Sequence, residues 1–93
     1  MQPLNRAVPG ALAELFRSAP LSPGKVECAW KAAVGPALQR ATAVRLEGGR
    51  LLVDAVSTEW AHEVSRSSYM ILPRLQLLLG KDAVHRIEVR RHR

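Results

Sequence analysis

Few side chains in this sequence could act as catalytic groups or as metal ligands. His62 and Glu63 stand together, as they do at the start of the zinc-binding helix of many metalloproteases. That motif needs a second histidine at position 66, which is Arg66 here. The remaining candidates are far apart in the sequence and do not complete a set of metal ligands: His85, His92 and Cys28. We therefore expect no catalytic site, no metal and no cofactor, and a protein that is not an enzyme.

Positive charge is the chemical property that distinguishes the sequence. Its 93 residues include 14 Lys and Arg against 8 Asp and Glu, which gives a formal net charge of +6. In a domain of this size, such an excess favours contact with a polyanion or with an acidic protein surface. The candidate contacts are basic residues spread over the chain: Lys25, Lys31, Arg40, Arg45, Arg50, Arg86, Arg90, Arg91 and Arg93.

Nearby acidic residues leave a second interpretation open for the arginines in the predicted strands. Glu47, Asp54 and Glu88 lie among the arginines in the segments that are predicted to be strands. Cross-strand ion pairs would neutralise much of that surface, and this alternative stands beside a binding role. Any contact with phosphate is expected to be weak, independent of sequence and strongly dependent on salt.

The bulk properties indicate one small globular domain. Hydrophobic residues make up 47% of the chain and charged residues 24%, as in ordinary folded proteins. No apolar segment approaches the roughly 20 residues that a membrane-spanning helix needs, and the N-terminus lacks the apolar core of a secretory signal. The single cysteine excludes an internal disulfide and fits a reducing, cytoplasmic setting. We expect a cytoplasmic protein with neither a membrane nor a small-molecule partner.

Hydrophobic periodicity predicts two helices in the first half of the chain. Residues 4–18 form the first, with an apolar face made by Leu12, Leu15 and Phe16. The second begins at Ser22, a good N-cap before Pro23, and ends or bends at Gly35. A further turn of helix is expected over residues 36–39.

The rest of the chain alternates between strand and helix patterns. Residues 42–47 and 51–56 flank a Gly-Gly turn and predict a hairpin. A third helix, capped by Ser57 or Thr58, follows, and Pro73 is expected to kink it or to split it into helices at about 57–72 and 73–79. Gly80 ends it. Residues 84–90 predict a last strand whose inward side chains are His85, Ile87 and Val89.

This order, α-α-β-β-α(-α)-β, predicts an α+β fold. It would be a two-layer KH-like domain, with a three-stranded sheet covered by helices on one face. The third strand would lie either parallel beside the second or antiparallel beside the first. We expect the domain at 22–90, preceded by an N-terminal helix and linker at 1–21 and followed by a basic tail at 91–93. No two glycines are three residues apart, so the G-x-x-G clamp of true KH domains is missing.

Several segments, in this order, resemble the DciA family of bacterial proteins. They are Trp30–Gly35, Gly49–Val53, Ser57–Glu63, Ile71–Leu75 and Ile87–Arg90. The resemblance implies a KH-like fold, binding to the hexameric replicative helicase and to single-stranded DNA, and a non-enzymatic role in loading that helicase. Trp30, Gly35 and Trp60 match signature positions of the family. We interpret both tryptophans as core residues that hold helices against the sheet, and Gly35 as the site of a sharp backbone passage or of close packing.

Two alternatives from other functional classes remain. One is a small KH-like module that binds RNA or associates with the ribosome. The other is an adaptor whose basic surface meets only an acidic protein. Recovery of RNA from cells would favour the first, and poor binding of nucleic acid even at low salt would favour the second.

Overall fold

The structure, a computed structural model, describes residues 20–91. The helix predicted over residues 4–18 and the candidate contact Arg93 lie outside that range. Within it, the chain forms α2 (Pro23–Val34), α3 (Pro36–Arg40), β1 (Thr42–Glu47), β2 (Arg50–Ala55), α4 (Thr58–Leu79) and β3 (Arg86–Arg91). This is the α+β, KH-like arrangement that the sequence predicts.

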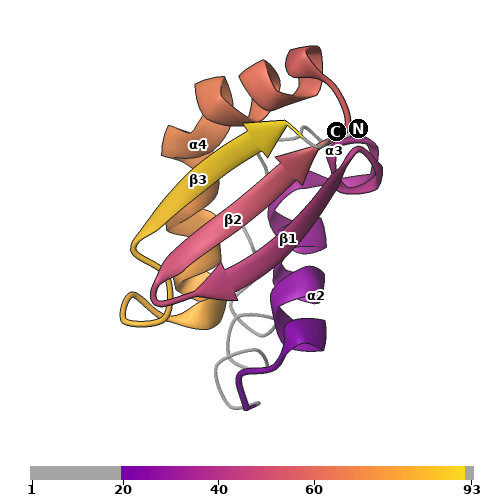
Figure 1. The fold of residues 1–93 in the computed structure, drawn as a ribbon. Helices are drawn as coiled ribbons and strands as arrows, with labels where there is room; N and C mark the ends of the chain where they lie inside the picture. Colours follow the sequence, from indigo (N-terminus) through magenta and orange to yellow (C-terminus); the bar gives the residue numbers. More distant parts are fainter. Residues whose placement is uncertain (1–19, 92–93) are drawn as a thin grey trace, which may run out of the picture.

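The three strands form one mixed sheet in the order β1-β2-β3. β1 and β2 make the predicted antiparallel hairpin, and β3 pairs in parallel with β2. This decides between the two positions that the sequence left open for the third strand. Helices α2 and α4 lie on the same face of the sheet, and no element of residues 20–91 covers the other face (Figure 1).

Trp30 holds α2 against the sheet, as predicted. Ser22 caps this helix by accepting a hydrogen bond from the backbone N–H of Lys25 at 3.1 Å. Trp30 is only 2% exposed. Its indole N–H donates to the Thr42 hydroxyl at 2.9 Å, and that hydroxyl donates to the Leu38 carbonyl at 2.7 Å. One buried ring thereby joins α2, α3 and β1 without leaving its polar atom unsatisfied.

The helix after the hairpin is one continuous helix, so of the two outcomes expected at Pro73, a kink or a division, the division into two helices is wrong. α4 runs for 22 residues, from its N-cap Ser57 to its C-cap Gly80, with Pro73 inside it. Pro73 and Tyr69 both lie on the exposed side of α4. The Tyr69 carbonyl that loses its helical partner can therefore bond to water, and the buried side of the helix keeps its hydrogen bonds.

β3 begins at Arg86, two residues later than predicted, and the prediction that His85 faces inward is wrong. His85 is exposed, and its backbone N–H donates to the Gly49 carbonyl at 2.6 Å. The imidazole ring lies so close to Gly49 that a β-carbon there would overlap it. Ile87 and Val89 do pack against the core, as expected. Arg91, expected in the tail, is the last residue of β3.

Gly35 makes the sharp passage between α2 and α3. Its φ of 88° and ψ of 172° lie in a region that is essentially restricted to glycine. It ends α2 by donating from its N–H to the Lys31 carbonyl at 2.9 Å, and its own carbonyl accepts the Gln39 N–H at 3.1 Å. Of the two roles expected for Gly35, the structure shows the sharp backbone passage and not the close packing, because nothing lies within 4 Å of where its β-carbon would be.

We expect Gly35→Ala to lower the free energy of unfolding by about 1–3 kcal/mol, the usual cost of a strained backbone conformation. A β-carbon at this position would touch nothing within 4 Å, so the cost comes from the backbone alone. Urea unfolding measures it. Gly24→Ala, in the first turn of α2, is the matched control and should be neutral or slightly stabilising, because alanine is the better helix former. If Gly35→Ala and Gly24→Ala are equally stable, the strained backbone conformation assigned to Gly35 is contradicted.

Candidate nucleic-acid and protein interfaces

The uncovered face of the sheet, here called the outer face, carries three side chains from each strand. In register across the sheet they form three rows: Ala43, Asp54 and Arg90; Arg45, Leu52 and Glu88; Glu47, Arg50 and Arg86. The central residue, Leu52, is only 6% exposed although no helix covers it. Arginine stems can cover apolar surface in this way while their guanidinium groups stay in water. Leu52 is therefore less exposed than strand alternation alone predicts for a residue at the centre of the outer face.

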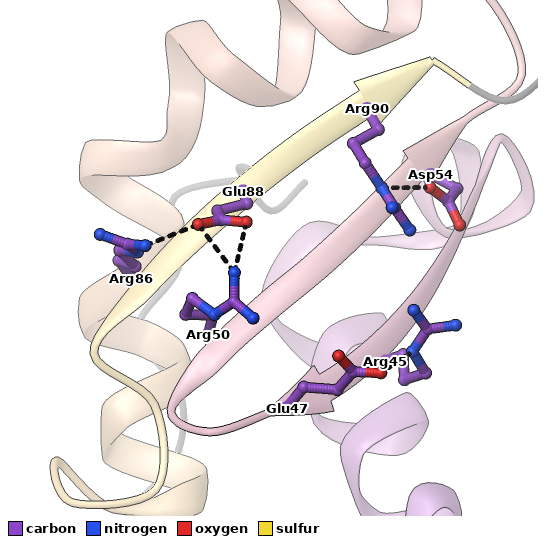
Figure 2. Close-up of polar contacts among 7 residues, drawn as sticks. All are labelled: Arg45, Glu47, Arg50, Asp54, Arg86, Glu88 and Arg90. Atoms are coloured by element: carbon purple, nitrogen blue, oxygen red, sulfur yellow. Dashed lines mark hydrogen bonds and ion pairs between the residues drawn. The ribbon is translucent and has the colours of Figure 1, made fainter.

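Each carboxylate of the outer face is paired with an arginine (Figure 2). Arg90 bonds Asp54 across the strands at 3.1 Å, and Arg45 bonds Glu47 along β1 at 2.6 Å. Glu88 accepts from Arg50 at 3.1 Å and from Arg86 at 2.7 Å. Four arginines and three carboxylates leave this face with little net charge. Such exposed pairs contribute little stability individually, but they hold the guanidinium groups in fixed positions.

Glu88 is the most strongly coupled acid of this network. Partial desolvation acts to raise its pKa, but the hydrogen bonds and positive charges of Arg50 and Arg86 outweigh that effect, and the pKa lies below the ordinary value. A carboxylate whose pKa is depressed by folding adds stability above its unfolded pKa. That contribution is lost as the pH falls through the lower, folded pKa.

We expect Glu88→Gln to destabilise the protein more at neutral pH than in acid. The difference in melting temperature between the two proteins should narrow as the pH falls below about 4.3, the ordinary pKa of glutamate. Thermal unfolding from pH 7 to pH 3 measures this difference. Glu27→Gln, at an exposed position of α2, controls for the loss of one negative charge. If the difference in melting temperature is the same at every pH, the proposed stabilisation of the Glu88 carboxylate by Arg50 and Arg86 is contradicted.

Two basic residues that are not on the outer face lie at the end of the sheet next to α3, and we call them the α3-end cluster: Arg40 and Arg91. The backbone places both at this end, because Val56 donates to the Ala41 carbonyl at 3.0 Å and Arg91 is paired with Ala55. Both side chains are exposed. Within residues 20–91, no carboxylate forms an ion pair with Arg40 or Arg91. Here the positive charge is less neutralised than on the outer face.

The remaining candidate contacts do not join this cluster. Lys25 lies in the first turn of α2, whereas Lys31 lies in the last turn, and Lys31 is exposed. The structure thus divides the candidates within residues 20–91 into the outer-face arginines Arg45, Arg50, Arg86 and Arg90, which are held in ion pairs, the α3-end cluster of Arg40 and Arg91, and two lysines on α2.

A third surface is an apolar groove of about 680 Å3, which we call the helix groove. It lies between the α2–α3 junction and one side of α4, and its walls include Val34, Leu38, Trp60, Met70 and Ile71. Trp60 is half-buried, so the expectation that both indole rings lie inside the core is wrong for this ring. Sequence periodicity did not find the groove, because the pattern of one helix cannot show which of the elements within residues 20–91 pack against it.

Charged side chains border the helix groove. Glu59 and Glu63 lie on the α4 side, and Glu63 is paired with Arg66 along the helix. Arg74 closes one end by donating to the Ala33 carbonyl at 3.1 Å, at the C-terminus of α2 where a positive charge is favourable.

Residues 20–91 hold no cluster of three or more His, Cys, Asp or Glu side chains that could bind a metal ion. Cys28 is a free, exposed thiol on α2. None of the helices in the described range is long and apolar enough to cross a bilayer.

The sequence model of the DciA family, described as the antecedent of DnaC and DnaI, matches residues 3–89. The chain belongs to the DciA family. This family is associated by name with helicase loading and DNA replication, and its members are adaptors of the replicative helicase rather than catalysts. No curated protein matches the chain.

Of the three residues that resemble signature positions of the family, two have the structural roles that the sequence predicts. Trp30 is a core residue with a satisfied N–H group, and Gly35 adopts a glycine-only conformation. The third, Trp60, has part of its ring in the core and part in the helix groove. It is thus the signature residue that also reaches a surface.

Proposed function

We propose that this DciA protein is a non-enzymatic adaptor that binds the hexameric replicative helicase and assists its loading onto single-stranded DNA. The match to the DciA family over residues 3–89 carries this proposal. Adaptors of this kind act through surfaces, and the described part of the chain offers charged and apolar surfaces around a small rigid core.

The α3-end cluster is the part of the surface that best fits the DNA backbone. Arg40 and Arg91 are exposed and carry no ion pair, so a phosphate group need not displace a carboxylate to reach them. The outer face is less suited, because its arginines are already bonded to Asp54, Glu47 and Glu88. Two arginines make few phosphate contacts, so the cluster by itself is expected to give weak, sequence-independent binding, with a salt slope of only about 0.7 for each contact.

Co-elution with the cognate replicative helicase tests the first half of the proposal. Mixed at micromolar concentrations, the two proteins should elute together in size-exclusion chromatography. The amount of helicase retained on a single-stranded oligonucleotide should rise when this protein is added. Separate elution together with unchanged retention would refute the adaptor function.

A capture experiment from native cell extract separates this function from the RNA-binding alternative. The tagged protein should recover the replicative helicase, with nucleic acid present only at low salt. Selective recovery of RNA without the helicase would instead favour a KH-like RNA-binding module, which the order of elements in the fold also permits.

A further inference from the structure

β1 is an outer strand of the sheet, and its open edge carries backbone groups that no other strand of residues 20–91 pairs with. The Val56 N–H donates to the Ala41 carbonyl at 3.0 Å, so the backbone groups of Ala41 face β2. In an antiparallel ladder, every second residue faces the same neighbouring strand. The N–H and C=O groups of Thr42, Val44 and Leu46 therefore point away from β2. Within residues 20–91, no backbone group forms a hydrogen bond with them from that side.

A small apolar cavity of about 240 Å3 lies beside this edge, between the start of α2 and β1. α2 contributes Pro23 and Val26 to its lining, and β1 contributes Val44 and Leu46. The side chains of Val44 and Leu46 pack against the core but are only half-buried. Leu21, also part of the lining, is 54% exposed. An open strand edge beside an apolar cavity suits the addition of an extended peptide, because backbone hydrogen bonds supply affinity and the cavity selects side chains.

Arg45 determines the charge that an added strand would meet. It is the charged residue of the cavity lining, its side chain is 59% exposed on the outer face, and it bonds Glu47 at 2.6 Å (Figure 2). Because its backbone groups face β2, the residue opposite it on an added antiparallel strand would form the closer, non-hydrogen-bonded type of pair. Opposite charges are favourable in such a cross-strand pair and like charges are not. A carboxylate opposite Arg45 would therefore be preferred over a positive charge.

The other edge strand of the sheet, β3, is less suited to strand addition. Four of its six residues are charged, against two of six in β1. Charged side chains along an edge strand oppose pairing with a further strand. Strand addition is therefore expected at β1 rather than at β3.

We propose that the open edge of β1 binds an extended segment of a partner protein, which adds a fourth strand antiparallel to β1. The segment has apolar side chains opposite Val44 and Leu46, where successive inward positions of a strand reach the cavity. Between them it has an acidic side chain, opposite Arg45. This site does not depend on the proposed function, because it is tested with the isolated protein and peptides, and its failure would leave the adaptor function untouched.

Amide hydrogen exchange of the full chain, followed by nuclear magnetic resonance, tests whether the edge is open. The amides of Val44 and Leu46 should exchange at least about ten-fold faster than those of Ala43 and Arg45, which face β2. If Val44 and Leu46 are as protected as their neighbours, another segment of the chain already occupies the edge and the proposal is overturned. Protection that rises with protein concentration would instead assign the edge to a second copy, which also overturns it.

Selection from a phage-displayed library of random ten-residue peptides tests the chemistry of the occupant. We expect enrichment of sequences in which an acidic residue stands between two apolar residues. A synthetic peptide with such a sequence should slow the exchange of the Val44 and Leu46 amides several-fold. The double variant Arg45→Glu, Glu47→Arg is the matched control, because it keeps the net charge and reverses only the ion pair of β1. With this variant, the enriched middle residue should change from acidic to basic.

Val44→Pro tests the backbone contacts, because proline removes an N–H that faces the edge and takes no part in the ladder with β2. The synthetic peptide should bind this variant at least about ten-fold more weakly, since β-strand addition depends on backbone hydrogen bonds. Val44→Thr keeps the amide and the branched shape and should bind nearly as the parent does. The Trp30 indole signal, held by Thr42, reports that each variant is folded. Full binding to a folded Val44→Pro variant, no enriched sequence, or a middle residue that stays acidic with the reversed ion pair would each overturn the proposal.

Discussion

Trp30→Ala is expected to lower the free energy of unfolding by about 3–5 kcal/mol, the range for emptying a large buried aromatic site. Trp30 is 2% exposed and packs within the core cluster formed by α2, α4 and β2. Its removal also leaves the Thr42 hydroxyl without the donor that now reaches it. Small domains are stable by only about 5–15 kcal/mol, so this variant should be partly unfolded at physiological temperature.

Urea unfolding followed by circular dichroism measures this loss. Trp60→Ala is the informative comparison, because it removes the same atoms from a half-buried position. It should cost clearly less than Trp30→Ala, since the loss of stability scales with the buried surface and the cavity left behind. If the two variants are equally destabilised, Trp60 contributes as much to the core as Trp30 does. A Trp30→Ala variant as stable as the parent would contradict the assigned core.

The features that the sequence predicted correctly are those fixed by local interactions. Ser22 and Ser57 cap helices because a hydroxyl needs only the N–H groups of the next turn. The Gly48–Gly49 turn fixes the register of the hairpin in the same local way. The inward and outward faces of β1 follow from strand alternation. In each of these cases the residues that decide the structure are only a few positions apart.

The features that sequence reasoning left open or missed depend on residues far apart in the chain. The pairing of β3 with β2 joins positions 36 residues apart, as in Asp54 and Arg90, and both placements of β3 satisfied the local pattern. Leu52 became buried on the outer face because side chains from other strands surround it. Trp60 lies on an apolar helix face, but the periodicity of one helix cannot show which neighbour covers it.

The pairing of the candidate basic residues likewise depends on residues far apart in the chain. Their number and positive charge were evident from composition, but the sequence did not show which of them are neutralised. Pairing depends on register: the three carboxylates of the outer face bond four of the nine candidates. Among the described strand and α3 residues, the arginines without an ion pair are Arg40 and Arg91, and both lie at the end of the sheet next to α3.

Arg40→Gln combined with Arg91→Gln is therefore expected to weaken binding to single-stranded DNA by more than the loss of two charges elsewhere. Each phosphate contact on a single strand contributes about 0.7 to the slope of log K against log salt concentration. If both arginines contact phosphates, the slope should decrease by about 1.4, because two fewer counterions are released on binding. Fluorescence anisotropy with a labelled oligonucleotide, at several salt concentrations, measures the slope.

Arg66→Gln combined with Lys81→Gln is the matched control. It lowers the net charge by the same amount, and both residues are exposed and outside the α3-end cluster. Its salt slope should equal that of the unmodified protein, because net charge acts at long range whereas counterion release requires a contact. Equal slopes for the two double variants would mean that no phosphate sits at the α3-end cluster. If the Arg40 and Arg91 variant loses DNA binding but still co-elutes with the helicase, DNA and helicase occupy different surfaces of this small domain.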